Sequence, residues 1–348
     1  MSAQNTSEKF TRPFAVLSVL FFIFGLITSL NDILVPHLKD VFTLTYMQAS
    51  LVQFCFFFAY FVASVPSGYI AKRVGYKTGI IIGLLTAGIG CLLFYPAASI
   101  KSYPFFLLAL FVLACGITML QVVCNAFVTV LGRPETASSR LTLAQAFNSV
   151  GTAIGPVVGG LVILSVVTES VSSMSPEALA QYTSQQAEAV QLPYLALTLF
   201  LVLLAVIVTR LRLPDPLVNE APSDVPHTKK QVHYQQHDSV WGYRHLVLGA
   251  VGIFAYVGAE VSIGSYLVSL MGMPQVAGLE TKVASHYLAL YWSGAMVGRF
   301  IGAYVLRKMK PGYVLAFNAL MSALLIAVAV VSSGPVAMYV GFDCDWLL

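Results

Sequence analysis

A single carboxylate stands at the end of the first long apolar run of this sequence. Asp32 lies in the stretch SLNDILVPHLK, and the run that leads to it begins at Phe14 and carries no other charge before Lys39. A charge at the centre of a bilayer costs on the order of 2.5–3.5 kcal/mol, so such a residue usually faces a partner or a water-filled cavity. We therefore predict that Asp32 is a reversible proton carrier. The structural alternative is a carboxylate that caps the helix end or reaches outward.

Two other ionisable residues lie well inside apolar runs. Glu260 occupies the middle of FAYVGAEVSIGSYL, between Gly258 and Gly264, and such small residues allow neighbouring helices to approach closely. It is predicted to bind a cation or a sugar hydroxyl, and the alternative is an interhelical hydrogen bond of structural value. Arg299 lies nearer the cytoplasmic end of its run, where a structural ion pair or snorkelling is the favoured role.

Uncharged amide side chains form two pairs in the middle of the chain. Gln121 and Asn125 are four residues apart, and Gln145 and Asn148 are three apart, so each pair shares one face of a helix. Amides offer hydrogen-bond donors and acceptors without a formal charge, which suits an uncharged, polyhydroxylated solute. The alternative is amide hydrogen bonding that only joins helices. Tyr256 adds an aromatic ring that can stack on a sugar or anchor its helix at the membrane interface.

The elements that carry these residues are expected to be membrane helices. Hydrophobic residues make up 58% of the 348 residues and charged residues only 10%, and the mean hydropathy is +0.81. A soluble domain carries roughly a quarter charged residues. The apolar runs have about the 20 residues that cross a bilayer, and the alternation of a membrane barrel is absent, so the spans must be helices. The expected spans lie near residues 14–36, 46–68, 78–98, 104–131, 141–166, 192–211, 246–270, 285–306 and 312–332.

No group of residues suited to catalysis stands out. Cys55, Cys91, Cys115 and Cys124 lie inside apolar runs at spacings that fit neither zinc nor disulfides, so they are expected to be small buried residues. The sequence shows no nucleotide-binding loop and no Ser/His/Asp arrangement. We therefore expect no enzyme activity, no catalytic residue, no metal site and no cofactor. The chain is expected to act as a monomer in the lipid bilayer, with no nucleic-acid partner.

The basic residues predict the orientation of the chain. If the N-terminus is cytoplasmic, fifteen lysines and arginines fall in inner segments and three in outer loops, while Arg299 lies within a span. Inner loops of membrane proteins carry such an excess of basic residues. We therefore expect a multi-pass protein of a bacterial-type inner (plasma) membrane, with its N-terminus in the cytoplasm.

A polar segment divides the chain after the sixth expected span. Residues 212–244 hold four prolines, three histidines and several charges, and are expected to form a cytoplasmic linker. This predicts an N-terminal six-helix bundle at 1–211 and a C-terminal bundle at 245–348, as in transporters made from two similar halves. The last apolar run meets two aspartates soon after residue 331, so the second bundle is expected to be incomplete, with about nine to ten helices in all. A truncation, a frameshift and a natural early end all remain open.

Four stretches carry a resemblance to a known family: SLNDILVPHLKDVFTLTYMQASLVQFCFF, LQVVCNAFVTVLG, RLTLAQAFNS and FAYVGAEVSIGSYL. From about Phe14 to about Met338 the chain resembles the major facilitator superfamily and, within it, the fucose–galactose–glucose:proton symporter family. The resemblance implies two six-helix bundles with alternating access to a central site. It also implies a cytoplasmic gating loop, whose motif is matched by Gly68, Arg73, Gly75 and Lys77.

The resemblance also assigns roles to the polar residues. In the fucose permease branch, the aspartate matching Asp32 and an acid at the position of Gln121 are linked to proton coupling and sugar binding. Here Gln121 replaces that acid, and Glu260 stands where the fucose branch has an amide, as in the bacterial glucose/galactose transporters. This leaves Asp32 and Glu260 as coupling residues, with a proton or sodium as the coupling ion. The predicted substrate-binding set is Asn31, Gln121, Asn125, Gln145, Asn148, Tyr256 and Glu260.

The expected function is therefore symport of a glucose- or galactose-type hexose with a cation, by alternating access. A transporter for fucose or another solute of the same superfamily is the first alternative. An inactive, truncated chain is the second.

Overall fold

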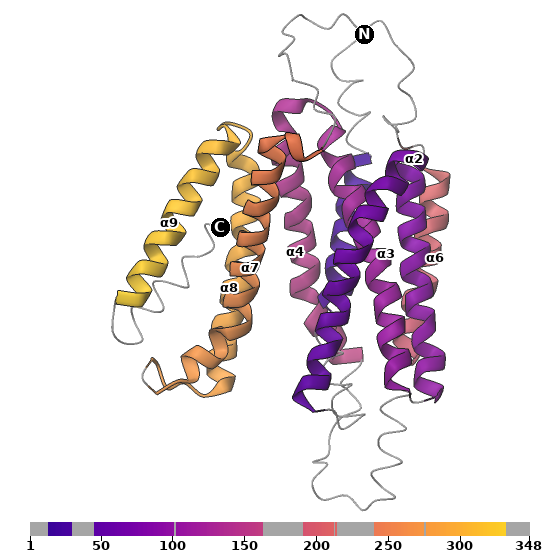
Figure 1. Cartoon of the computed structure of the whole chain (residues 1–348), viewed down its shortest axis with the longest axis horizontal. Coiled ribbons are helices and arrows are strands. Elements are labelled where there is room, and N and C mark those ends of the chain that lie inside the picture. Colours follow the sequence, from indigo (N-terminus) through magenta and orange to yellow (C-terminus); the bar gives the residue numbers. More distant parts are fainter. Residues whose placement is uncertain are drawn as a thin grey trace, which may run out of the picture. The chain divides into compact units, whose positions relative to one another are not determined.

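Helices make up nearly all of the chain that the structure describes. The computed structural model describes residues 13–29, 45–100, 102–162, 191–211, 213, 240–274 and 276–331, and no strand occurs among them. Its α-helices are Pro13–Ser29, α2 (Tyr46–Ile100), α3 (Tyr103–Val130), α4 (Ala137–Val162), α6 (Gln191–Arg210), α7 (Arg244–Gly272), α8 (Thr281–Val305) and α9 (Pro311–Val331) (Figure 1). Short 3₁₀ turns, η1 (Pro134–Thr136) and η4 (Val240–Gly242), precede α4 and α7. Each expected span overlaps one of these helices, so the predicted all-α membrane architecture is confirmed.

The helix α2 contains two of the expected spans. At 55 residues it is more than twice as long as the bilayer requires, and parts of α2, α3, α6, α7 and α9 are long and apolar enough to cross a membrane. Gly75 interrupts α2 with φ 83° and ψ 169°. Only glycine takes this backbone region without strain, so the chain turns there and divides α2 into 46–74 and 76–100.

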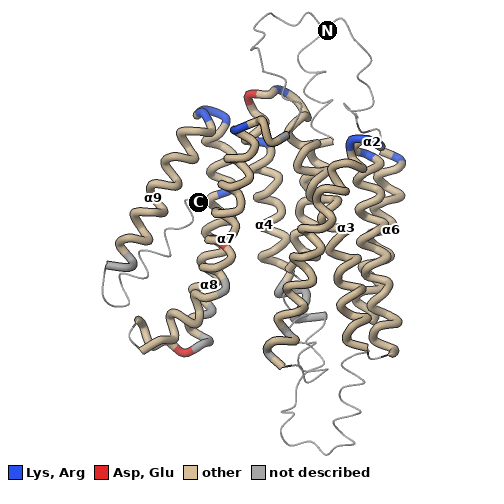
Figure 2. The backbone as a smooth tube through the Cα atoms, in the orientation of Figure 1, with Lys and Arg blue, Asp and Glu red and all other residues tan. Residues whose placement is uncertain are grey.

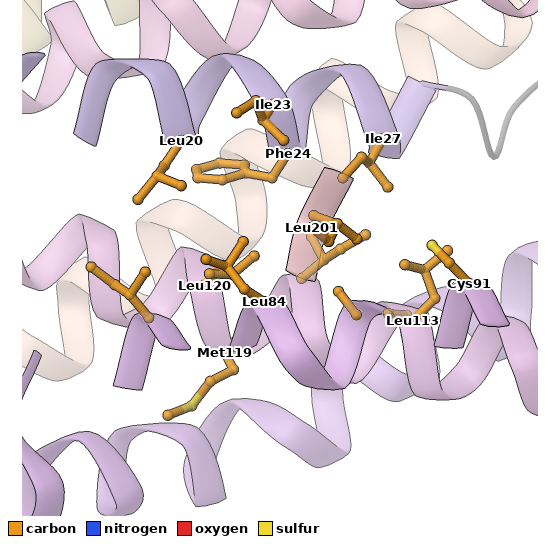
Figure 3. Close-up of a cluster of buried hydrophobic side chains, with 14 of the residues drawn as sticks. Leu20, Ile23, Phe24, Ile27, Leu84, Cys91, Leu113, Met119, Leu120 and Leu201 are labelled. Atoms are coloured by element: carbon orange, nitrogen blue, oxygen red, sulfur yellow. The ribbon is translucent and has the colours of Figure 1, made fainter. Parts of the chain in front are cut away.

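The chain divides into two compact units, which are described separately. Unit 1 comprises Met1–Asn219 and Arg299–Pro311, and unit 2 comprises Glu220–Gly298 and Gly312–Leu348. The core of unit 1 joins the helix Pro13–Ser29, the second half of α2, α3 and α6. Its members include Leu20, Ile23, Phe24, Ile27, Leu84, Cys91, Leu113, Met119, Leu120 and Leu201 (Figure 3). In unit 2, Leu267 and Met271 of α7 pack against Ala284 and Tyr291 of α8.

Glycines bring the first helix and α4 into backbone contact. A Cβ added to Gly151 would overlap the carbonyl oxygen of Phe22, and one added to Gly25 would overlap that of Asn148. Small residues at such positions let membrane helices pack through their backbones, where dispersion contacts are densest. The contact fixes Asn148 against the first helix.

The turn between α3 and α4 is held by one guanidinium group. Arg140 donates from Nε to the Val128 carbonyl oxygen (3.2 Å), from Nη2 to that of Thr129 (2.9 Å) and from Nη1 to that of Arg133 (2.9 Å). These bonds satisfy carbonyl groups that the end of α3 leaves without helical partners. Gly132, with φ +93°, makes the reversal possible. As a result, α4 runs back along α3 in a fixed register.

Basic residues mark one end of unit 1. Lys and Arg lie at the turn within α2, at the α3–α4 turn, at the end of α6 and between α8 and α9 (Figure 2). Lys77 also donates from Nζ to the Thr209 carbonyl oxygen (2.8 Å), which ties the turn in α2 to the end of α6. A positive group there also complements the negative end of the helix dipole.

The close contact at Gly151 predicts a stability loss. Gly151→Ala should lower the free energy of unfolding by about 1–3 kcal/mol, because the added methyl group forces α4 away from the first helix. The measurement is the midpoint of thermal unfolding of the purified protein in detergent.

Gly252→Ala on α7 is the matched control, because a Cβ there meets no atom within 4 Å. It should leave the midpoint unchanged or raise it slightly, since alanine favours the helix. Equal midpoints for the two variants would contradict the packing described for Gly151.

Candidate functional site

The four predicted amides of unit 1 all hydrogen-bond across helix boundaries. Gln121 on α3 donates from Nε2 to the hydroxyl oxygen of Tyr60 on α2 (3.2 Å). Gln145 on α4 donates from Nε2 to Oδ1 of Asn125 on α3 (3.1 Å). Asn148 donates from Nδ2 to the carbonyl oxygen of Phe21 in the first helix (3.1 Å). The two pairs predicted from spacing are therefore joined to each other through Asn125 and Gln145.

The polar face of α4 is longer than the predicted pair. Gln145, Asn148, Ser149 and Thr152 follow each other at i, i+3, i+4 and i+7, the spacing of one helical face. Ser149 Oγ donates to the Gln145 carbonyl oxygen and Thr152 Oγ1 to that of Asn148, both at 3.1 Å. These hydroxyl groups satisfy their donors within the helix.

Arg299 extends this polar row from α8. Its Nη1 donates to Ser149 Oγ (2.5 Å), and four residues further on, the Ala303 carbonyl oxygen accepts from Ser139 Oγ (2.5 Å). Ser139 and Ser149 are about 15 Å apart along α4, whereas Arg299 and Ala303 are about 6 Å apart along α8. The guanidinium therefore reaches away from the basic end of unit 1. The structural ion pair or snorkelling predicted for Arg299 stays a prediction, and the contact seen here is with the Ser149 hydroxyl.

We refer to Tyr60, Gln121, Asn125, Gln145, Asn148, Ser149 and Arg299 as the amide row. Its four amides are half-buried, while Val123, Cys124 and Phe127 of the same α3 helix are fully buried. Within the described part of the chain, Oε1 of Gln121, Nδ2 of Asn125, Oε1 of Gln145 and Oδ1 of Asn148 make no hydrogen bond. Among the described residues, three acceptor atoms and one donor group are thus unused, in addition to the second N–H of each bonded amide nitrogen.

Such unsatisfied capacity is costly against hydrocarbon. A polar group that loses its hydrogen bonds in an apolar medium costs several kcal/mol, so half-buried amides with unused capacity at membrane depth require water or a polar solute. The chemistry it offers is hydrogen bonding to a neutral solute with several hydroxyl groups.

Two of the other predicted site residues belong to unit 2. Glu260 and Tyr256 are on α7 in unit 2, where Glu260 is half-buried and its carbonyl oxygen accepts from the Tyr291 hydroxyl (3.4 Å). Trp292 packs over Gly264 and makes an edge contact with Tyr291, with ring centroids 5.1 Å apart. Asp32 and Asn31 lie outside the residues that the structure describes.

Arg73, Gly75 and Lys77 of the predicted gating loop lie at the turn in α2, and Gly68 lies about two helical turns earlier in the same helix. Gly75 makes the turn, Arg73 stacks on the Tyr69 ring at 4.4 Å, and Lys77 holds the end of α6. From Tyr60 to this turn the helix runs about 22 Å, so the loop is a separate feature from the amide row. Among the described residues, no group of three or more His, Cys, Asp or Glu side chains is placed to hold a metal ion.

Three members of the amide row were not predicted as site residues. Tyr60 is hidden in the aromatic run QFCFFFAYF, where its neighbours suggest only lipid contact. Ser149 follows directly from the helical spacing of α4 and could have been found. The role of Arg299 depends on which helix packs beside α8, and the sequence gives no signal for that.

Comparison with known proteins places the chain among membrane transporters. The family model for the Major Facilitator Superfamily matches residues 17–344. The glucose/galactose transporter of Brucella abortus biovar 1 is 49% identical over 337 residues, which cover 96% of this chain and 77% of that protein. The L-fucose-proton symporter of Escherichia coli is 35% identical over a region that covers 95% of this chain and 76% of that protein. A crystal structure of the transporter FucP in the outward conformation superimposes with a TM-score of 0.84 at 34% identity, covering 97% of this chain and 82% of that one.

Exposure of the amide row can be tested with thiol chemistry. In a background where Cys55, Cys115 and Cys344 are replaced by alanine, Asn125→Cys should react with a small, membrane-impermeant thiol reagent in inside-out or right-side-out vesicles. The thiol of Cys124, the preceding residue on the same helix, is fully buried and serves as the matched control. Labelling of Cys124 but not of the introduced thiol in the N125C variant would contradict the placement of the row.

Proposed function

Because this chain belongs to the Major Facilitator Superfamily and, within it, to the fucose–galactose–glucose:proton symporter family, we propose that it carries a glucose- or galactose-type hexose together with a proton. It is a multi-pass membrane protein and a transporter, not an enzyme. The identity to the glucose/galactose transporter exceeds that to the fucose symporter, which favours glucose or galactose over fucose.

The observation that carries this proposal is the amide row. In the described part of the chain its half-buried amides have three unused acceptor atoms and one unused donor group, and none of the amides carries a charge. A hexose presents several hydroxyl groups, each of which both donates and accepts. A drug-like or apolar solute would leave the amides without partners, which costs free energy.

The remaining predicted residues complete the proposed site. Asn31 contributes a further amide, Tyr256 an aromatic face for the sugar ring, and Glu260 a carboxylate that accepts hydrogen bonds from sugar hydroxyls and assists coupling. Asp32 loads a proton from outside, the two bundles rock about the site, and Asp32 releases the proton inside. The loop of Gly68, Arg73, Gly75 and Lys77 closes the cytoplasmic side.

The basic end of unit 1 supports a proposed orientation. Lys and Arg of the turn in α2, of the α3–α4 turn, of the end of α6 and of the segment between α8 and α9 lie at this end (Figure 2). By the positive-inside rule we propose that this end faces the cytoplasm, with the N-terminus on the same side. We take the membrane to be a bacterial-type inner membrane.

Uptake into vesicles tests the proposed coupling. With pH and sodium gradients imposed separately on vesicles that contain the full chain, labelled glucose or galactose should accumulate under the pH gradient alone. Asp32→Asn should abolish this accumulation and retain exchange of internal for external sugar, because an amide cannot carry the proton.

Asp40→Asn, in the polar stretch just beyond, is the control and should accumulate sugar like the unmodified chain. Accumulation that follows the sodium gradient would replace the proton in the proposal. Full proton-driven accumulation by Asp32→Asn would remove Asp32 from the coupling role.

Glu260→Gln separates sugar binding from coupling. Hydrogen bonds to a charged group contribute about 1.5–3 kcal/mol, so loss of the charge should raise KM for sugar about tenfold or more. The initial rates of uptake over a range of sugar concentrations give KM, and the accumulation ratio under a pH gradient gives the coupling. An unchanged KM with lost accumulation would instead make Glu260 a coupling residue alone.

A further inference from the structure

Tyr60 is held rigidly beside the amide row. It is half-buried on the first half of α2, and its ring packs on Phe56 with centroids 5.1 Å apart and on Phe57 with centroids 6.5 Å apart. Phe56 itself is buried. A tyrosine has few rotatable bonds, so these ring contacts fix the position of its hydroxyl group.

The amide of Gln121 lies with its nitrogen end against the Tyr60 hydroxyl, a group that can both accept and donate. A carboxamide has one nitrogen end, which donates, and one oxygen end, which accepts. In the structure Gln121 gives its Nε2 to the Tyr60 hydroxyl oxygen (3.2 Å). Its Oε1 therefore points away from Tyr60 and makes no hydrogen bond within the described part of the chain.

This orientation changes what Gln121 offers to a solute. Asn125 lies one turn along the same face of α3; its Oδ1 accepts from Gln145, and its Nδ2 makes no hydrogen bond among the described residues. With Gln121 fixed, the row presents an acceptor at Gln121 next to a donor at Asn125. A freely turning Gln121 would present either end, and a hydroxyl that donates would meet an acceptor only part of the time.

We propose that Tyr60 is a positioning residue of the sugar site, which fixes Gln121 so that its Oε1 accepts a hydrogen bond from one sugar hydroxyl. The claim rests on the proposed hexose transport. Gln121 then provides an acceptor as a carboxylate would, without a charge that a proton could remove. The competing role is simple interhelical bonding between α2 and α3, which would stabilise the fold and leave sugar recognition unaffected.

The experiment compares sugar uptake by the full chain and by Tyr60→Phe. Loss of the hydroxyl frees Gln121, and loss of one hydrogen bond corresponds to roughly a fivefold rise in KM. The maximal rate should remain within about twofold, since the ring packing is retained. Tyr60→Leu, which also removes the ring, should raise KM further; because it can fail to fold, Tyr60→Phe is the deciding variant.

Deoxy analogues of glucose identify the hydroxyl concerned. In the unmodified chain, one analogue lacking a single hydroxyl should compete less well than glucose because Gln121 Oε1 loses its partner. In the Tyr60→Phe variant, the difference in competition between this analogue and glucose should be smaller. A purely structural role of Tyr60 would leave the ranking of the analogues unchanged.

A double-variant cycle tests whether Tyr60 acts through Gln121. In the Gln121→Met background no amide remains to be oriented, so adding Tyr60→Phe should leave KM unchanged. Tyr103→Phe is the matched control, because the Tyr103 hydroxyl also joins α3 to α2, donating to the Gln48 carbonyl oxygen at 2.6 Å. It should leave KM and the analogue ranking as they are.

The outcomes separate this inference from the function on which it rests. If the unmodified chain takes up no hexose, the proposed function fails and the role of Tyr60 fails with it. If the unmodified chain transports hexose while Tyr60→Phe keeps its KM, or raises KM equally with and without the Gln121 amide, only the positioning role is overturned. A fall in thermal stability with unchanged KM also overturns it and identifies Tyr60 as an interhelical contact.

Discussion

The hydrogen-bonding requirement of polar side chains at membrane depth governs the organisation of unit 1. Moving an amide from water into hydrocarbon without hydrogen bonds costs several kcal/mol of free energy. The amide must therefore pair with protein or face water. The amide row does both, since each amide takes part in one hydrogen bond to a neighbouring helix and keeps the rest of its capacity on a half-buried face. The hydrogen bond to the neighbouring helix fixes the side chain, and the unused donors and acceptors are available to a solute. A site built in this way is ordered before the sugar arrives, which lowers the entropy lost on binding.

Glycine contacts and one arginine determine the register of α4 against its neighbouring helices. Gly25 and Gly151 bring the first helix against α4, and Arg140 saturates the carbonyl groups at the end of α3. With α4 fixed against both neighbours, Asn148 reaches one of them and Gln145 the other. A shift of α4 by one residue would turn its polar face by about 100° and separate Gln145 from Asn125. Close glycine packing therefore contributes to function as well as to stability.

Much of this arrangement follows from the sequence because its signals are local. Hydrophobic length predicts the spans, and the i, i+3 and i, i+4 spacings predict which amides share a face. The pairing of Tyr60 with Gln121 joins residues 61 positions apart, and that of Arg299 with Ser149 joins residues 150 apart. Such pairs depend on which helices are neighbours and on how deep in the membrane each residue lies. Composition predicts neither. The contact between Arg299 and Ser149 could not be predicted for this reason.

A neutral row has a consequence for how sugar and proton are linked in the proposed cycle. Amides do not titrate in the physiological range, so sugar binding to Gln121, Asn125, Gln145 and Asn148 does not itself change with the local proton concentration. The link must then pass through a conformational equilibrium that both ligands bias, with the proton acting at a separate carboxylate. Fixing Gln121 through Tyr60 fits this division of labour, because the acceptor that meets the sugar stays the same whether or not the carboxylate is protonated. In the proposed cycle, sugar recognition by the four amides and proton carriage by Asp32 are thereby assigned to different side chains, while Glu260 takes part in both.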